Sequence, residues 1–340
     1  MDIAIKNNVK LSDYSTFKIG ALARFFVIVT SEKELDMALK WARKKRKKVF
    51  ILGGGSNTLF SDRNFSGLII KNEIKGIEVI GENENDVIIK SYSGEIWSKL
   101  VNFTIERNLY GLENTFYIPG TVGAAPIQNI GAYGMEIKDS FYNLAAIEIK
   151  TGEIKYFNLK DCDFSYRHSI FKGKLKGQYF ILWVEFKLSK TKKINLSYPV
   201  IKNILIEKGL EDPSLKQISE IIFKIREEKL PNPAVLANAG SFFKNPVITH
   251  GVFESLKEKF PDIKYFNEEH GIKIPAAWLI EQCGLKGERL GPVGVYDKQA
   301  LIIVNYGGAK QKDVLSLVKI IKNEVKNKFN INLETEVNIL

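Results

Sequence analysis

The sequence predicts an α+β fold. Some short apolar segments alternate with polar residues and others run continuously, and both patterns are typical of strands. Amphipathic helical segments lie between them, in an arrangement that does not resemble a TIM barrel. From about Asp212 the character changes, because a helix-like segment leads to the proline pair Pro231 and Pro233.

In the first third of the chain, residues 24–29 (RFFVIV) predict a strand, and residues 31–45 predict a helix. Ser31 and Glu34 form the capping-box pattern at the start of that helix. The next strand starts at Val49 and runs into GGGSN, residues 53–57. We then expect strands at 68–71 and 87–91 and a helix at 95–107.

Later strands are expected at 145–150, 179–188 and 300–305, and later helices at 216–230, 274–283 and 312–329. The chain would close with a strand over NLETEVNIL, residues 332–340. No internal repeat or low-complexity tract interrupts this order.

Length and composition restrict the kind of protein. A chain of 340 residues with 45% hydrophobic and 26% charged residues predicts a globular protein of two to three domains. No apolar run approaches the roughly 20 residues that span a bilayer. The N-terminus lacks the pattern of a signal peptide, so we expect a cytoplasmic protein.

Cysteine, histidine and charge give further expectations. Cys162 and Cys283 are far apart and predict buried, reduced thiols, and the three histidines lack the spacing of metal ligands, so no metal is expected. The net charge of +11 raises the possibility of nucleic-acid binding, but only eight of the 50 basic residues are Arg and the lysines are scattered. The basic run 43–48 is interpreted as the solvated end of a helix.

Two glycine-rich segments favour a nucleotide cofactor. In GGGSN, successive backbone N–H groups can turn toward a pyrophosphate, although the motif is neither a dinucleotide fingerprint nor a P-loop, and a plain hairpin is an equal alternative. The segment IPGTVGAAPIQNIGAYG, residues 118–134, lets backbone approach a flat ligand closely. A purely structural loop of this length would be uncommon.

Two further segments carry chemical groups. SYRHSIFK, residues 165–172, contains Arg167, whose guanidinium could bind a carboxylate or stabilise developing negative charge; a surface Arg in a turn is the alternative. NAGSFFKNP, residues 238–246, places Ser241 after Gly240 and beside Phe242 and Phe243, which suits proton delivery in a dry pocket. The alternative there is a capping Ser with two Phe in a core.

Together these segments resemble the UDP-N-acetylenolpyruvoylglucosamine reductase family. RFFV, GGGSN, GLEN at Gly111, the 118–134 loop, YRHSIFK, KLPNP, NAGSFFKNP, AAWLIEQCGLKG and LETEV all occur in the family's order over nearly the whole chain. The tyrosine at position 198 is similar to that of the subgroup with an extra tyrosine loop, although a proline follows it here.

The resemblance implies a vanillyl-alcohol-oxidase-type FAD-binding fold and a substrate-binding domain. Lobe 1 would comprise residues 1–75 with the strand at about 333–340, lobe 2 residues 76–230, and the substrate domain residues 231–332. FAD would be bound non-covalently, with NADPH as co-substrate. The residues implied in cofactor binding are Gly53, Gly54, Gly55, Ser56, Asn57, Ile118, Gly120, Thr121, Gly123, Ala124, Gln128, Asn129, Gly131, Tyr133 and Gly134.

The resemblance also implies the reaction and its residues. Hydride would reach the terminal methylene of the enolpyruvyl group, Arg167 would stabilise the enolate-like charge with Glu336 as its acidic partner, and Ser241 would donate the proton. Glu334 is the excluded neighbour. The residues implied in binding the UDP-sugar are Tyr198, Arg226, Lys229, Asn245 and Gln299.

Two other functions stay open from the sequence alone. A related flavin oxidase would share the glycine-rich segments but lack Arg167, Ser241 and Glu336 as a set. A basic nucleic-acid-binding protein would carry no flavin and would bind DNA in a salt-sensitive way. For the leading reading we expect small-molecule partners, no nucleic acid, no membrane and a monomer.

Overall fold

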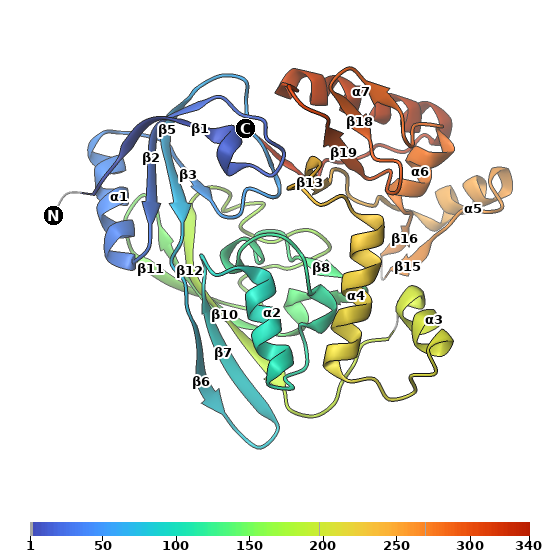
Figure 1. Cartoon of the computed structure of the whole chain (residues 1–340), viewed down its shortest axis with the longest axis horizontal. Coiled ribbons are helices and arrows are strands. Elements are labelled where there is room, and N and C mark those ends of the chain that lie inside the picture. The colour runs from blue at the N-terminus through green and yellow to red at the C-terminus, as the bar shows by residue number, and fades with distance from the viewer. Residues whose placement is uncertain (1–2, 197, 269) are drawn as a thin grey trace. The chain divides into compact units, whose positions relative to one another are not determined.

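The computed structural model describes residues 3–196, 198–268 and 270–340 (Figure 1). Its contacts divide the chain into two compact units. Unit 1 comprises Met1–Val9, Ala23–Gly54 and Phe65–Glu228; unit 2 comprises Lys10–Leu22, Gly55–Asn64 and Lys229–Leu340. This division groups residues 10–22 and 55–64 with the C-terminal residues, whereas the predicted first lobe kept 1–75 together. The three-part domain scheme stays a prediction.

Unit 1 begins with a small sheet in the order β1-β2-β5-β3, in which β5 is parallel to β2 and β3. Helix α1 packs on this sheet, with Leu35 and Leu39 in the same buried cluster as Val27 and Ile70 (Figure 1). The bounds are β1 (Lys6–Lys10), β2 (Leu22–Val29), α1 (Glu32–Lys44), β3 (Val49–Leu52) and β5 (Phe65–Asn72).

Only half of the capping box predicted for α1 forms as expected. The Ser31 hydroxyl accepts the Glu34 N–H at 3.3 Å. The Glu34 carboxylate, however, accepts from the Thr30 N–H and hydroxyl, each at 2.7 Å, and these bonds lower the pKa of Glu34. The charged acceptor still lies at the helix N-terminus, where the helix dipole favours it.

A larger antiparallel sheet follows in the order β11-β10-β12-β7-β6. Helix α2 packs on it through Trp97, whose ring meets Phe186 edge-on at 5.8 Å. Cys162 is buried in the same cluster, and burial raises the pKa of its thiol to about 12. The bounds are β6 (Ile77–Glu82), β7 (Asp86–Tyr92), α2 (Trp97–Glu106), β10 (Phe141–Glu148), β11 (Ile154–Asn158) and β12 (Tyr179–Ser189).

Unit 1 ends with two helices that share a buried cluster of their own, α3 (Pro199–Glu207) and α4 (Leu215–Lys229). The sequence reasoning missed α3. Its start is nevertheless readable, because Pro199 occupies the first turn, where a missing N–H costs nothing, and Tyr198 is the N-cap residue.

Unit 2 contains a four-stranded sheet (β13-β19-β18-β17), a three-stranded sheet (β14-β16-β15) and the parallel pair β20-β4. Phe242 and Phe243 are buried in its core, as the structural alternative for NAGSFFKNP required. The bounds are β4 (Thr58–Leu59), β13 (Ala237–Ser241), β14 (Val247–Ile248), α5 (His250–Lys259), β15 (Phe266–Glu268), β16 (Gly271–Lys273), α6 (Ala276–Gln282), β17 (Arg289–Leu290), β18 (Val293–Val295), β19 (Ile302–Asn305), α7 (Gln311–Phe329) and β20 (Asn338–Ile339).

The α+β class is confirmed, and one predicted element is wrong in extent. The closing strand expected over residues 332–340 is reduced to Asn338–Ile339, preceded by a single bridge between Thr335 and Phe243.

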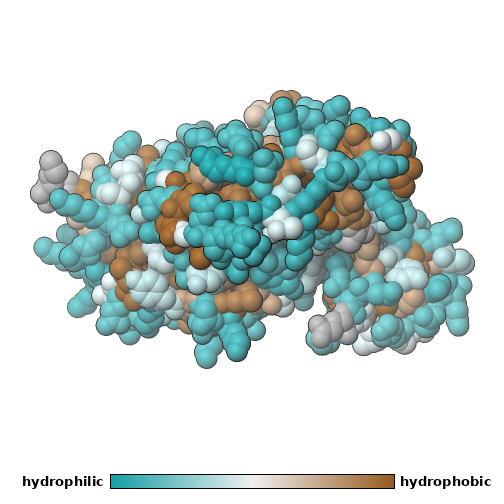
Figure 2. All heavy atoms as spheres, turned by 90° about the horizontal axis from the view of Figure 1, so that it is seen from below, coloured by the Kyte–Doolittle hydropathy of each residue, from teal (hydrophilic) through white to brown (hydrophobic). Residues whose placement is uncertain are grey.

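On the face drawn in Figure 2, hydrophobic residues reach the surface only in patches between hydrophilic ones. Within the described ranges, no helix combines the length and apolarity needed to cross a membrane.

Candidate functional site

The two glycine-rich segments meet within unit 1, backbone against backbone. A Cβ added to Gly53 would lie 2.6 Å from the Thr121 hydroxyl, and one added to Gly54 would lie 3.0 Å from the Gly120 Cα. Side chains would therefore separate the two loops. The hairpin alternative for GGGSN is excluded, because β3 pairs with β5 and β4 pairs with β20.

Gly55 is fixed by a different neighbour, within unit 2. Its φ is +66°, and an added Cβ would lie 2.0 Å from the Tyr14 carbonyl oxygen. Gly53, Gly54, Ser56 and Asn57 each keep some exposed surface, so a ligand could reach their backbone. A loop of small residues with accessible N–H groups fits the phosphates of a flavin nucleotide.

Gly55→Ala should lower the free energy of unfolding by about 2–4 kcal/mol, since it adds both a positive-φ penalty and a steric clash. Gly209→Ala is the matched control, because Gly209 has a φ of +64° and no described residue comes within 4 Å of its added Cβ. Thermal unfolding of both holoproteins measures the difference. Equal losses would mean that Gly55 is required only for its backbone angle.

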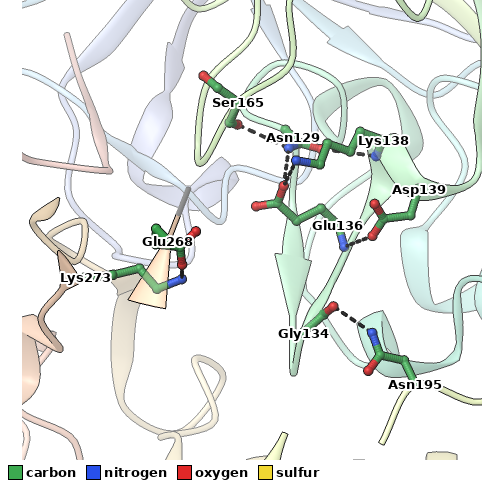
Figure 3. Close-up of polar contacts among 9 residues, drawn as sticks. All are labelled: Asn129, Gly134, Glu136, Lys138, Asp139, Ser165, Asn195, Glu268 and Lys273. Carbon is green, nitrogen blue, oxygen red and sulfur yellow. Dashed lines mark hydrogen bonds and ion pairs between the residues drawn. The ribbon is translucent and has the colours of Figure 1, made fainter. Parts of the chain in front are cut away.

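The Arg167 turn lies against the second glycine-rich segment. Figure 3 shows Ser165 of this turn beside Asn129 of the segment. Ser165 and His168 close the turn through reciprocal backbone bonds of 3.2 and 3.0 Å. Arg167 has a φ of +52°, and its Nη2 donates to the Gly131 carbonyl at 2.7 Å. The guanidinium is thus anchored to the loop and is not a loose surface group.

Asn129 holds this loop and the turn together. Its Nδ2 donates to the Ser165 carbonyl at 3.1 Å and to the Glu136 carboxylate at 2.8 Å, and its Oδ1 accepts the Lys138 N–H at 3.2 Å (Figure 3). The side chain is fully buried. Its amide is therefore used within the protein, which makes it a support for the loop.

The other members of the loop have different neighbours. Gln128 accepts from Lys172 at 2.9 Å, and an added Cβ on Gly123 would lie 2.5 Å from the Ser93 Cβ. Ala124 and Gly134 are exposed, whereas Thr121 and Gly131 are buried and Ile118 packs partly buried against the α2 cluster.

GLEN contributes two buried side chains, Glu113 and Asn114, to which the sequence assigned no role. Asn114 Nδ2 donates to the carbonyls of Tyr133 and Asn195, both at 2.9 Å, and Asn195 Nδ2 donates to the Gly134 carbonyl at 2.8 Å. Glu113 accepts the Gly111 N–H at 2.7 Å, and burial raises its pKa.

Tyr133, Tyr198 and Arg226 form an aromatic and cationic cluster in unit 1. The Tyr133 and Tyr198 rings meet edge-on at 5.3 Å, and Arg226 is hydrogen-bonded to Tyr133. Burial lowers the pKa of Arg226 and raises those of both tyrosines. The buried Nε of Arg226 has no hydrogen-bond partner among the described residues, which suits an anionic ligand.

Ser241 ends strand β13 beside an irregularity in the sheet. Gly240 has a φ of +71°, and its N–H donates to the Asn238 side chain at 2.9 Å. The Phe242 N–H then donates to the Leu301 carbonyl at 2.7 Å. The serine is thus held at a bulge, with its following residue anchored in the core.

Glu336 lies on the segment next to Ser241 within unit 2. The Glu336 N–H donates to the Phe242 carbonyl at 2.8 Å, and the Glu336 carbonyl accepts from Asn57 of GGGSN at 3.4 Å. Glu334 instead pairs with Lys244 at 3.2 Å, and its side chain is 74% exposed. The two acidic residues therefore have different environments, which the sequence could not separate.

The remaining predicted substrate residues are spread over unit 2. Lys229 is exposed at the end of α4, and Gln299 is half-buried before β19. Asn245 Oδ1 accepts the Ala276 N–H at 2.9 Å and so caps α6. Nearby in sequence to α6, Lys273 forms an ion pair with Glu268 between β16 and β15 (Figure 3).

The structure thus gathers the predicted residues into two groups. Unit 1 holds Arg167, the 118–134 loop, Tyr198 and Arg226, and unit 2 holds Ser241, Glu336 and Asn57. Within residues 3–196, 198–268 and 270–340, no three His, Cys, Asp or Glu side chains are grouped as metal ligands would be.

Two family models match the chain. An FAD binding domain matches residues 23–157, and the C-terminal domain of UDP-N-acetylenolpyruvoylglucosamine reductase matches residues 232–340. The first match confirms the predicted flavin-binding domain, and it includes both glycine-rich segments and ends before the Arg167 turn.

Full-length relatives agree. UDP-N-acetylenolpyruvoylglucosamine reductases from Flavobacterium johnsoniae and Amoebophilus asiaticus are 45% and 46% identical, each over 99% of both chains, and that of Pseudomonas syringae is 40% identical over 100% of both. The crystal structure of the reductase from Thermus caldophilus has the same fold, with a TM-score of 0.69 at 23% identity over 99% of both chains.

Proposed function

This chain belongs to the UDP-N-acetylenolpyruvoylglucosamine reductase family, and we propose that Arg167, Ser241 and Glu336 carry the chemistry of its reaction. That reaction is the NADPH-dependent, FAD-mediated reduction of UDP-N-acetylglucosamine enolpyruvate to UDP-N-acetylmuramate in peptidoglycan precursor synthesis. Bound FAD supplies the hydride carrier between NADPH and the enolpyruvyl group.

The glycine-rich segments are the proposed FAD site. Residues 53–57 offer backbone N–H groups to the pyrophosphate, and residues 118–134 offer small side chains along the flavin. The observation that supports this assignment is the direct backbone contact of Gly54 with Gly120. Gln128 and Asn129 stabilise this loop through hydrogen bonds, Gln128 with the Lys172 side chain and Asn129 with the Ser165 carbonyl.

Arg167 and Glu336 are proposed to act on developing charge. When hydride adds to the terminal methylene carbon, the electron pair of the double bond moves toward the carboxylate. The Arg167 guanidinium, held by the Gly131 carbonyl, stabilises that charge, and Glu336 is its acidic partner. Both groups act without exchanging atoms with the substrate.

Ser241 is proposed to complete the reduction. Its hydroxyl gives a proton to the carbon adjacent to the methylene, and the double bond becomes a single bond between CH and CH₃. The serine oxygen then recovers a proton from water or a neighbouring group.

Substrate phosphates are proposed to contact Tyr198, Arg226, Lys229, Asn245 and Gln299. The buried guanidinium nitrogen of Arg226 supports this proposal most directly. We also propose that the protein is a cytoplasmic monomer of the tyrosine-loop subgroup that binds no nucleic acid. Size-exclusion chromatography tests the monomeric state, and salt-titrated DNA binding tests whether the protein binds nucleic acid.

The activity is tested by two additions to the anaerobic holoprotein. NADPH should bleach the yellow flavin, and the enolpyruvyl UDP-sugar should then restore the colour in a single turnover. UDP-N-acetylglucosamine, which lacks the enolpyruvyl group, should not restore it. Bleaching that the enolpyruvyl sugar cannot reverse would contradict the assigned reaction.

A further inference from the structure

A threonine near the N-terminus connects two parts of the proposed site that are far apart in sequence. Thr16 follows a short 3₁₀ helix (Leu11–Tyr14) and is half-buried. Its neighbours are Gly55 of GGGSN and Asn238 of NAGSFFKNP, which lies 222 residues away. All three belong to unit 2.

The first set of contacts fixes the Gly55 carbonyl. The Thr16 N–H donates to it at 3.2 Å, and the Thr16 hydroxyl lies 3.4 Å from it. The described peptide bonds contain no cis bond, so the Ser56 N–H must point opposite to that carbonyl. By holding the carbonyl toward itself, Thr16 turns the Ser56 N–H to the other side, where the loop can bind an anion.

The second set of contacts fixes the serine turn. The Thr16 hydroxyl donates to the Asn238 carbonyl at 2.7 Å, and the Asn238 N–H donates back to the Thr16 carbonyl at 3.1 Å. Asn238 is almost fully buried, and its side chain accepts the Gly240 N–H at 2.9 Å. Gly240 directly precedes Ser241, so Asn238 holds the backbone from which the serine side chain extends.

The surroundings of Gly240 and Thr16 show how each is held. No described residue comes within 4 Å of an added Cβ on Gly240, so that glycine is required for its φ of +71° and not for space. Phe17, the residue that follows Thr16, is fully buried, and its backbone carbonyl accepts a hydrogen bond from the Asn305 side chain at 3.0 Å. Thr16 is therefore attached to a rigid core, which lets it act as a fixed reference for both loops.

We propose that Thr16 is a positioning residue: it fixes the position of the phosphate-binding loop GGGSN relative to the turn that carries the proposed proton donor Ser241. This proposal rests on the proposed roles of GGGSN and Ser241. It assigns to one hydroxyl an effect on cofactor affinity and on the half-reaction that needs the proton, and none on the half-reaction in which NADPH reduces FAD.

The test uses Thr16→Val, which removes the hydroxyl at nearly constant volume, and Thr16→Ser, which keeps it. In Thr16→Val, FAD should dissociate from the holoprotein about tenfold more readily, and reoxidation by the enolpyruvyl UDP-sugar should slow about tenfold, as expected for the loss of one partly buried hydrogen bond. Reduction of the remaining bound FAD by NADPH should stay within about twofold of wild type. Thr16→Ser should stay within about twofold of wild type in FAD dissociation, in reoxidation and in reduction.

Thr104→Val is the matched control, because the Thr104 hydroxyl is buried and donates to the Val101 carbonyl at 2.7 Å within α2. If it reproduces the Thr16→Val pattern, or if Thr16→Val slows both half-reactions equally, Thr16 has only a structural role. Unchanged FAD release and reoxidation in Thr16→Val would also overturn the proposal. A wild-type protein that fails the two-addition test would instead refute the proposed function.

Discussion

Ser241→Ala should leave FAD bound and reducible by NADPH, while reoxidation by the enolpyruvyl UDP-sugar slows by about 10²–10⁴-fold, the usual contribution of a general acid. The first half-reaction needs no proton from Ser241, whereas the second cannot be completed without one. Stopped-flow absorbance of the flavin, recorded separately for the two half-reactions under anaerobic conditions, measures both rates. The structure supports folding of this variant, since the anchoring bonds of the turn come from Gly240 and Phe242.

Two variants make this result specific. Ser316→Ala removes another serine hydroxyl from unit 2, which donates to the Lys312 carbonyl within α7 at 2.9 Å, and this variant should behave like wild type. Ser241→Cys keeps a transferable proton and should retain part of the rate. Normal reoxidation in Ser241→Ala would remove the serine from the mechanism.

Arg167→Ala should reduce the rate of substrate-driven reoxidation by about 10²–10³-fold, the range seen when one group that stabilises an oxyanion is deleted. FAD content and reduction by NADPH should be retained, because Asn129 still connects the turn to the loop through the Ser165 carbonyl. Single-turnover reoxidation over a range of substrate concentrations separates the rate from binding.

The left-handed backbone of Arg167 provides a second variant. At a φ of +52° glycine is unstrained, so Arg167→Gly removes the guanidinium while relaxing the backbone. Arg167→Gly should reoxidise as slowly as Arg167→Ala, and its free energy of unfolding should be no lower than that of Arg167→Ala. Arg167→Lys should remain impaired, because an ammonium group cannot reproduce the planar, bidentate guanidinium. Loss of flavin from all three variants would identify Arg167 as a structural residue.

The sequence predicted most of the helices and strands that carry the site, because these elements follow from the pattern of apolar residues within each segment. The strand at 24–29 and the helix at 31–45 follow from apolar periodicity, and both form with bounds shifted by a few residues. The closing strand was overestimated: LETEV alternates well, but among the described residues it contributes a single bridge, at Thr335, and the strand that forms is Asn338–Ile339. Whether an extended segment joins a sheet depends on partners from elsewhere in the chain.

Site residues could be named from motifs, but their relationships could not. The spacing of Glu334 and Glu336 places both on one face of an extended segment, and only the structure pairs Glu334 with Lys244. For a similar reason Thr16 was not singled out, and Asn114 was named only as part of the GLEN motif. Each is a common polar residue whose role comes from carbonyl groups that lie far away in sequence.

The interleaved composition of unit 2 determines when it can be assembled. Phe17 and Leu59 belong to its buried cluster, whereas most members of that cluster follow residue 229, and β4 pairs with β20 at the far end of the chain. During synthesis, Lys10–Leu22 and Gly55–Asn64 therefore leave the ribosome long before their partners exist. Closing loops of this length is entropically costly and slow. The loop that is proposed to bind the cofactor phosphates thus acquires its final support among the last steps of folding.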